Sequence, residues 1–237
     1  MIDLFLLPFA GGSKYSYNAL KRHLPADINF RPLEFPGRGA RLKEPLLYRI
    51  GQLVDDVAGK LGNPERPYAL FGHSMGAIVG YLLLHRLLQA NAPMPICFFA
   101  SGNDAPSFCP GSQQIHLVPE VEFPAAMNVY GGLPPGLLED ESLMRFFQPI
   151  LRADFEIYET YVHQRRPRLP CGITVLWGED DNTCTAAGLA AWQNETAQPI
   201  ESIGVAGDHF FVLKHAELVC RIITEKIFSS LARVTDK

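Results

Sequence analysis

The pentapeptide Gly72-His73-Ser74-Met75-Gly76 decides the fold, because of the segments on either side of it. An apolar run, residues 68–71, precedes it, and an apolar segment of helical length, residues 77–88, follows it. A G-x-S-x-G motif between a strand and a helix is typical of a nucleophile elbow, a sharp turn that holds a serine hydroxyl exposed. Glycines at its ends lack a Cβ, so the strand and the helix can pack closely around the turn. We therefore predict that Ser74 is a nucleophile.

Outward from the elbow, buried strands alternate with helical segments along most of the chain. The pattern predicts strands at residues 2–7, 28–33, 68–71, 96–100, 173–177 and 200–205. It predicts helices at residues 14–23, 48–61, 77–88, 186–196 and 216–231. Such alternation is typical of an α/β fold with a mostly parallel, doubly wound sheet. The length of 237 residues predicts a single domain, residues 1–237.

Residues 102–170 depart from the alternation. They contain nine of the nineteen prolines and two amphipathic helical pieces, residues 137–147 and 150–161, on either side of Pro149. Long insertions on one side of a domain usually carry function. We predict that this segment forms a helical cap, or lid, over the functional site, with a merely structural excursion as the alternative.

Composition and charge exclude several classes of function. The net charge of −4 argues against a protein that binds nucleic acid or a membrane surface. The five cysteines are an odd number without metal-like spacing, which indicates reduced thiols. The N-terminus does not resemble a signal peptide, and no apolar run is long enough to span a membrane. We therefore expect a cytoplasmic protein.

A nucleophilic serine needs a general base, and the sequence offers His209. In folds with this elbow, the chain order is serine, acid, histidine. His209 follows the last predicted strand, directly after the turn-forming Gly207-Asp208. The other six histidines lie within the elbow, on predicted helices or in polar segments. We therefore predict His209 as the base.

The acid that orients the base is less sharply defined. Asp180 and Asp181 both follow the strand at residues 173–177, and only one residue separates them. The G-x-x-D spacing favours Asp181 and leaves Asp180 open, with Asp208 and Asp154 as weaker candidates.

An acyl-transfer site also needs donors for the oxyanion. The backbone N–H of Met75, directly after the nucleophile, is one candidate. The second is expected in the loop after the first strand, at Ala10 or Phe9, where Gly11-Gly12 permits a tight turn. Each such donor contributes roughly 2.7–4 kcal/mol of transition-state stabilisation.

With these residues in view, the sequence resembles the type II thioesterases that accompany non-ribosomal peptide and polyketide synthases, members of the α/β-hydrolase superfamily. The similarity runs nearly from end to end, and its most specific parts are the first loop and a segment of the predicted cap. It rests on residues 7–13 (LPFAGGS), 35–39 (FPGRG), 71–77 (FGHSMGA), 149–155 (PILRADF) with 159–161 (ETY), 178–181 (GEDD) and 207–211 (GDHFF).

The resemblance implies Ser74 as nucleophile, Asp181 as orienting acid, His209 as base, and Met75 with Ala10 as oxyanion donors. It implies an acyl group on the phosphopantetheine arm of a carrier protein as substrate, in a monomeric enzyme with no cofactor and no metal.

Two departures from the family pattern bear on the acid. Asn182 stands where the family often has proline, and Asp208 stands where it usually has glycine. Asp208 could therefore compete with Asp181 to orient the histidine.

Selection of a carrier-bound thioester would depend on the predicted cap and on a basic segment. Residues 14–49 hold eight Lys and Arg against three acidic residues, a local charge of +5 that can steer an acidic partner. Arg38 and Arg41 are its candidates for contact with the phosphate or the carrier, and packing of their own loop or a solvated charge is an alternative of at least equal weight. We expect Arg152 and Asp154 to hold the cap helix together rather than to touch the substrate.

Three readings of function remain open from the sequence. The first is a thioesterase that removes stalled or wrong acyl groups from carrier proteins. The second is a small-molecule carboxylesterase, a lipase or a medium-chain fatty acyl thioesterase of the same fold. The third is a catalytically silent binding module on this scaffold.

Overall fold

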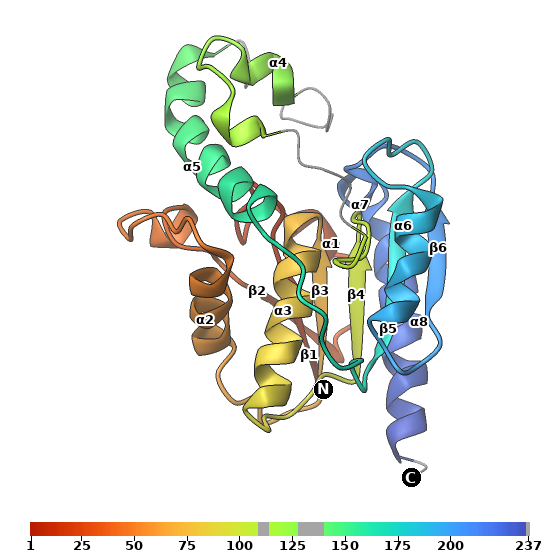
Figure 1. Ribbon diagram of the computed structural model, residues 1–237. Coiled ribbons are helices and arrows are strands. Elements are labelled where there is room, and N and C mark those ends of the chain that lie inside the picture. The colour runs from red at the N-terminus through yellow and green to blue at the C-terminus, as the bar shows by residue number, and fades with distance from the viewer. Residues whose placement is uncertain (109–113, 128–139, 236–237) are drawn as a thin grey trace.

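The computed structural model describes residues 1–108, 114–127 and 140–235, and its centre is a six-stranded parallel sheet (Figure 1). The strand order is β2-β1-β3-β4-β5-β6, and each neighbouring pair runs parallel. The predicted α/β sheet is thus confirmed. The strands are β1 (Ile2–Leu7), β2 (Ile28–Pro32), β3 (Tyr68–His73), β4 (Cys97–Ser101), β5 (Gly172–Gly178) and β6 (Glu201–Val205).

The order of the strands creates a crevice at the centre of the sheet. From β1 the chain moves outward to β2 and then returns to β3 on the other side of β1. The loops that follow β1 and β3 therefore leave the sheet in opposite directions. In open α/β sheets such a switch point, at the carboxyl ends of the strands, is where ligands bind. Here it brings the first glycine-rich loop next to the elbow.

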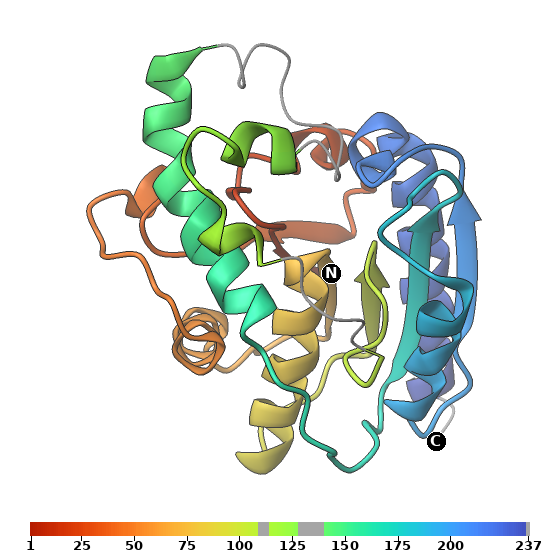
Figure 2. The ribbon, with the colours of Figure 1, turned by 45° about the horizontal axis from the view of Figure 1, so that its top comes forward.

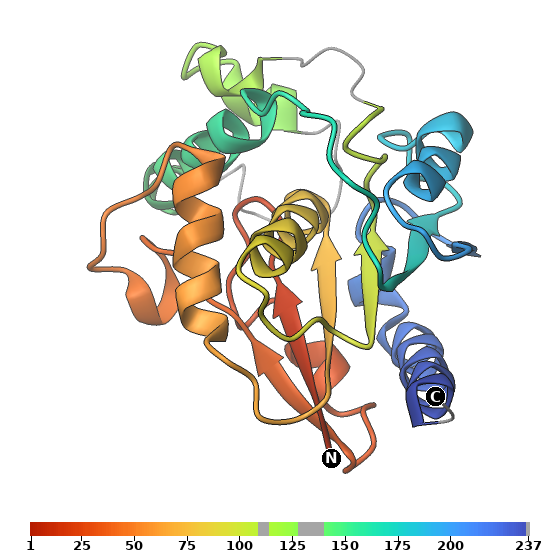
Figure 3. The same cartoon turned by 60° about the horizontal axis from the view of Figure 1, so that its bottom comes forward.

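Helices cover both faces of the sheet, which explains why all residues of β1, β3 and β4 are buried. One face packs against α2 (Ile50–Leu61), α3 (Met75–Gln89), α6 (Ala186–Ala190) and η4 (Ala191–Asn194). The other face packs against α1 (Asn18–Lys21), α7 (Phe211–Lys214) and α8 (Ala216–Thr235). Figure 3 shows α2 and α3 on one side of the strands and α8 on the other. A short η1 (Gly39–Arg41) follows β2.

The described helices of the segment between β4 and β5, here called the insertion, lie beyond the carboxyl ends of the strands (Figures 1 and 2). Its described elements are η2 (Ile115–Leu117), α4 (Phe123–Met127) and α5 (Glu141–Glu159). They share a small apolar core formed by Ile115, Phe123, Met127, Met144, Leu151 and Phe155.

Helix α5 corrects the prediction of two helical pieces separated at Pro149, although residues 137–139 of the first piece lie outside the described part. It runs through Pro149 without interruption. A proline removes one backbone hydrogen bond from a helix. Burial of Met144 on one side of it and of Ile150 and Leu151 on the other offsets that loss. Asp140 caps the helix by accepting hydrogen bonds from the N–H groups of residues 142 and 143.

Two predicted surface helices are shorter than expected. Residues 14–23 contain only the single turn of α1, because Ser13 and Ser16 form turns through their hydroxyls: Ser16 Oγ accepts from the N–H of Ser13, and Ser13 Oγ accepts from that of Tyr15. The helix expected at residues 186–196 is α6 followed by the tighter η4. Across the described ranges, no helix has both the length and the apolar character needed to cross a membrane.

Candidate active site

The elbow holds Ser74 in a strained backbone conformation between β3 and α3. Its φ of 55° and ψ of −123° are unusual for any residue other than glycine, and its N–H donates to the carbonyl of Ser101 at 2.7 Å. A Cβ on Gly72 would lie 2.1 Å from the carbonyl oxygen of Gly76, and one on Gly76 would lie 2.4 Å from that of Leu7. Only glycine fits at both positions, so the motif itself creates the turn.

His209 and Asp181 come together from the loops that follow β6 and β5. Nδ1 of His209 lies 2.8 Å from Oδ2 of Asp181, and the two side chains are only 4% and 1% exposed. This geometry suits an Nδ1–H that donates to the carboxylate, which leaves Nε2 free of the acid. Asp180, the neighbouring candidate, is exposed.

The other two carboxylates that were weighed as acids have different partners. Asp208 accepts from Nζ of Lys214 at 2.6 Å and from the N–H of Phe210 at 3.1 Å. Asp154 forms a buried ion pair with Arg38. Of the four candidates, the structure brings Asp181 to His209.

Thr183 holds the Asp181 carboxylate, and its hydroxyl oxygen also lies 3.1 Å from Nδ1 of His209. Its N–H and its hydroxyl donate to Oδ1 of Asp181 at 2.9 and 2.6 Å. Burial raises the pKa of Asp181, but the hydrogen bond and charge of His209, together with the two bonds from Thr183, outweigh it and lower the pKa to about 2. Asp181 is therefore ionised at neutral pH.

His73, beside the serine, is a buried neutral group. Its Nδ1 lies 2.9 Å from the hydroxyl of Ser101, and its ring packs 5.0 Å from that of His209 between centroids. Burial, followed by repulsion from His209, lowers the pKa of His73 well below its usual value. The ring of His73 therefore packs against that of His209 without carrying a charge.

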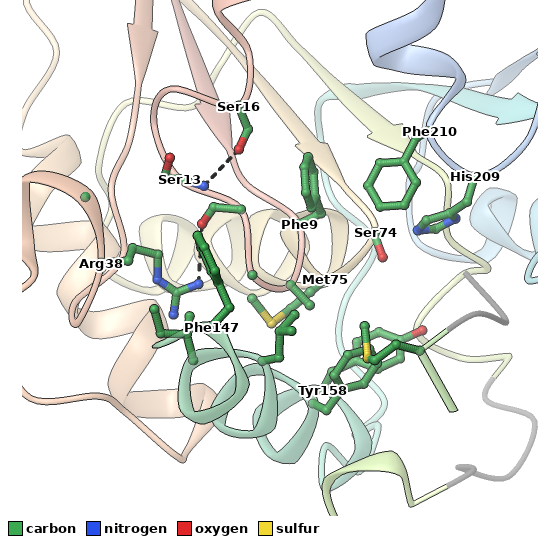
Figure 4. Close-up of a pocket in the computed structure, with 18 of the residues that line it drawn as sticks. Phe9, Ser13, Ser16, Arg38, Ser74, Met75, Phe147, Tyr158, His209 and Phe210 are labelled. Carbon is green, nitrogen blue, oxygen red and sulfur yellow. Dashed lines mark hydrogen bonds between the residues drawn. The ribbon is translucent and has the colours of Figure 1, made fainter. Parts of the chain in front are cut away.

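Ser74 and His209 both face an apolar cavity of about 620 Å³ beneath the insertion (Figure 4). Met75 and Ala10, the predicted oxyanion donors, line the same cavity. The far wall comes from the insertion and consists of Met127, Phe146, Phe147, Ile150, Leu151, Phe155 and Tyr158. The arrangement places Ser74, His209, Met75 and Ala10 in the lining of one largely apolar cavity.

The loop that carries Ala10 is a tight turn. The N–H of Gly12 donates to the carbonyl of Phe9 at 2.9 Å, and Gly11 has a φ of +75°. A positive φ at the third residue of a closed four-residue turn is the mark of type II, which favours glycine there. This explains why the second predicted donor sits next to a Gly-Gly pair.

Neither predicted contact residue of the basic segment is a free cation. Arg38 is buried and pairs with Asp154, although it reaches the edge of the cavity. Arg41 binds Asp56 and Glu44, and their hydrogen bonds raise its pKa. Of the two readings left open, the structure favours packing of the loop, because each guanidinium already has carboxylate partners.

Arg152 holds the insertion together, as expected from the sequence. Its guanidinium donates to the carbonyls of His116 and Val118 at 2.9 and 2.7 Å and stacks on the ring of Phe123. Asp154 instead ties α5 to the main body of the molecule through Arg38.

Two contacts near the site were not predicted. Thr183 stands two residues after Asp181, where a hydroxyl can close a local turn on the carboxylate, so the D-x-T spacing was a usable signal. The Arg38–Asp154 pair joins residues 116 positions apart, and nothing in the local sequence indicates it.

Comparison with known proteins agrees with this geometry. A family model described as "Thioesterase domain" matches residues 3–227. Linear gramicidin dehydrogenase LgrE of Brevibacillus parabrevis is 34% identical over 96% of this chain and 88% of its own length. The crystal structure of ClbQ from the colibactin NRPS/PKS pathway has a TM-score of 0.92 and 34% identity, and the match covers 98% of both chains. The type II thioesterase BorB from the borrelidin biosynthetic cluster has a TM-score of 0.87 and 32% identity over 95% of this chain and 92% of its own. This chain belongs to the thioesterase domain family.

Proposed function

We propose that this thioesterase is a discrete, type II enzyme that hydrolyses acyl groups from the phosphopantetheine arm of carrier proteins in a peptide or polyketide synthase system. The observation that carries the proposal is the buried Asp181–His209 pair, whose histidine faces the same apolar cavity as the strained Ser74. The similarity to BorB and ClbQ supports the substrate class.

In the proposed reaction, Nε2 of His209 takes the proton of the Ser74 hydroxyl as its oxygen attacks the thioester carbonyl. The oxyanion accepts hydrogen bonds from the N–H groups of Met75 and Ala10. The C–S bond then breaks, the protonated His209 gives its proton to the sulfur, the thiol of the phosphopantetheine arm leaves, and the acyl group remains as an ester on Ser74. The neutral His209 next takes a proton from water as the water oxygen attacks the ester. The C–O bond to Ser74 breaks, His209 returns the proton to the serine oxygen, and the free acid leaves. The ionised Asp181 stabilises the imidazolium in both steps.

Both the thiol leaving group and the acyl chain of an acyl thioester suit this site. A thiol has a pKa of about 8.5, far below that of an alcohol, so its departure needs little protonation. The cavity is apolar on the side of the insertion, so it favours a hydrocarbon acyl chain over a polar one.

The decisive experiment is single-turnover hydrolysis of a panel of acyl-carrier proteins, compared with matched free acyl esters, with Ser74→Ala as the control. We expect the carrier-bound thioesters to be hydrolysed faster and the variant to be inactive. A large preference for the free esters would indicate a carboxylesterase instead. Failure of the natural protein to hydrolyse any of these substrates, together with failure of a fluorophosphonate probe to label it, would indicate a silent binding module. Retained hydrolysis by Ser74→Ala would show that Ser74 is not the nucleophile.

One relative is named a dehydrogenase, so the same assay should follow a nicotinamide cofactor as well. We expect the acid product to form at the same rate with and without that cofactor. Turnover that depends on the cofactor would contradict hydrolysis as the activity of this chain.

A further inference from the structure

The ion pair between Arg38 and Asp154 joins three separate parts of the molecule beside the candidate oxyanion hole. Arg38 belongs to the loop after β2, and Asp154 lies on α5 of the insertion. Nη1 and Nη2 of the guanidinium lie 2.5 and 2.7 Å from the two carboxylate oxygens. The side chains are 6% and 1% exposed. A bidentate pair buried this deeply holds both partners in one geometry.

The third part is the turn after β1, which Asp154 binds directly. The N–H of Gly11 donates to Oδ2 of Asp154 at 2.7 Å. This N–H belongs to the central peptide of the Phe9–Gly12 turn, the peptide whose orientation distinguishes type II from type I. The carboxylate therefore holds the turn in one of its two forms. Arg38 adds a longer contact, 3.4 Å from Nη1 to the carbonyl of Gly12.

Packing reinforces the same attachment. A Cβ on Gly11 would lie 2.5 Å from Cδ2 of Leu151, so α5 rests directly on the turn. Leu151 and Asp154 are three residues apart and lie on the same face of the helix. One turn of α5 thus supplies both an apolar contact and a hydrogen-bond acceptor to Gly11.

The geometry points to Asp154, held by Arg38, as a positioning residue for the oxyanion hole: it anchors the turn so that the N–H of Ala10 stays aimed at the developing negative charge. The inference rests on the proposed function, in which Ala10 is an oxyanion donor. Such a donor must stay within about 2.7–3.1 Å of the oxyanion, and a misplacement of about 1 Å can cost on the order of 10²-fold in rate. The insertion then takes part in catalysis as well as covering the site.

Two matched double variants test the inference without leaving a lone buried charge. Arg38→Gln/Asp154→Asn keeps an amide oxygen that can accept from the N–H of Gly11, whereas Arg38→Leu/Asp154→Leu keeps none. The measurements are kcat and KM for p-nitrophenyl acetate and p-nitrophenyl octanoate, with the melting temperature of each protein. Arg41→Gln is the control, because it removes ion pairs of the same loop that do not touch the turn.

We expect the Gln/Asn protein to keep kcat within about fivefold of the natural protein, and the Leu/Leu protein to lose about 100-fold, the scale of one displaced oxyanion donor. The loss should fall on kcat, leave KM nearly unchanged, and be equal for both esters. Arg41→Gln should keep its kcat. Equal kcat in the two double variants when both are folded, or a loss confined to KM or to the octanoate ester, would overturn the inference.

The inference and the proposed function can fail separately in this design. Free esters and fluorophosphonate labelling report on the chemistry of Ser74 whatever the natural substrate is. A protein that ignores acyl-carrier proteins would contradict the proposed function, while the comparison of the two double variants would still decide the role of Asp154.

Discussion

Two adjacent aspartates have opposite environments after β5, and the turn between β5 and α6 is the cause. The N–H of Asp181 donates to the carbonyl of Gly178, and the N–H of Asp180 donates to that of Gly207. This turn directs the side chain of Asp181 inward to His209 and leaves Asp180 in solvent. A single position along the chain thus separates a buried carboxylate from a solvated one.

Removing the charge at position 181 should damage catalysis far more than removing it at position 180. We expect Asp181→Asn to lower kcat by about 10³–10⁴-fold, because an amide cannot stabilise the imidazolium and favours the wrong tautomer of His209. Asp180→Asn is the matched control and should remain within about twofold, since exposed charges contribute little. Measurement of thioester hydrolysis by both proteins checks this, and equal losses would show that Asp181 is not the orienting acid.

The lowered pKa of Asp181 predicts a specific pH dependence of stability. Its pKa falls from 3.8 to about 2 on folding, so its contribution is complete above pH 4 and is lost as the pH falls towards 2. A shift of this size corresponds to about 2 kcal/mol. We expect the difference in the free energy of unfolding between the natural protein and Asp181→Asn to shrink by about that amount from pH 5 to pH 2. Urea unfolding of both proteins measures it, and a difference that does not change with pH would contradict the prediction.

At the residue scale, the sequence predicted contacts that local spacing encodes and missed those that only folding creates. The motif around Ser74 and the position of His209 after the last strand followed from local pattern. The G-x-x-D spacing favoured Asp181 over Asp180, but the choice depended on the conformation of the turn that follows β5. The partners of Arg38 and Arg41 could not be predicted, because the local sequence around a loop arginine is the same whether its side chain is exposed or forms an ion pair.

At the scale of elements, strands were easier to predict than the helices at the surface. A parallel strand that is buried on both faces is a continuous apolar run, so β1, β3 and β5 are visible in the sequence. Helix α5 was predicted in two pieces because a proline is a local signal for a break, whereas the burial that carries the helix past it is tertiary. Helix α1 shows the opposite error, because it is shorter than predicted. The hydroxyls of Ser13 and Ser16 form turns where the apolar spacing favoured a helix.

The elbow itself gives a prediction about glycine. Gly72→Ala should unfold the protein at a lower temperature and abolish activity, because its Cβ would lie 2.1 Å from the backbone oxygen of Gly76, which cannot move without displacing α3. Gly59→Ala is the matched control: its Cβ would meet nothing within 4 Å on α2. We expect this control to be more stable by about 0.5–1 kcal/mol, as alanine is the better helix former. Thermal unfolding of both variants measures the contrast, and an active, stable Gly72→Ala protein would disprove the packing argument.

At the scale of the whole molecule, the parallel sheet determines where chemistry can occur. The switch in strand order between β1 and β3 opens a crevice, and the loops that fill it carry Ala10 and Ser74. The loops after β5 and β6 bring Asp181 and His209 together at the same edge. The insertion then closes the crevice from above and makes its inner wall apolar. The sequence predicted the sheet from its alternating elements, but the shape of the chamber depends on side chains from segments more than 100 residues apart.

The inner wall of the cavity should select the length of the acyl chain. Ile150 lines the cavity from α5 and is buried, so Ile150→Trp should shorten the space available to the substrate. Loss of one to two methylene contacts is worth about 1–3 kcal/mol, so kcat/KM for an octanoyl thioester should fall roughly 10–200-fold while that for an acetyl thioester stays nearly constant.

Leu143→Trp is the matched control for this substitution, because the side chain of Leu143 lies on the same helix but is 44% exposed and does not line the cavity. It should leave the activity towards both chain lengths unchanged. Hydrolysis of acetyl, butyryl, hexanoyl and octanoyl thioesters by the two proteins provides the measurement. An equal loss of kcat/KM for all chain lengths with Ile150→Trp would contradict the prediction. It would mean that the substituted helix disturbs the turn at Gly11, on which it rests, and that the acyl chain does not lie along Ile150. A graded loss that begins at one chain length would locate the end of the chamber, because each added methylene must occupy the space that the tryptophan ring has taken.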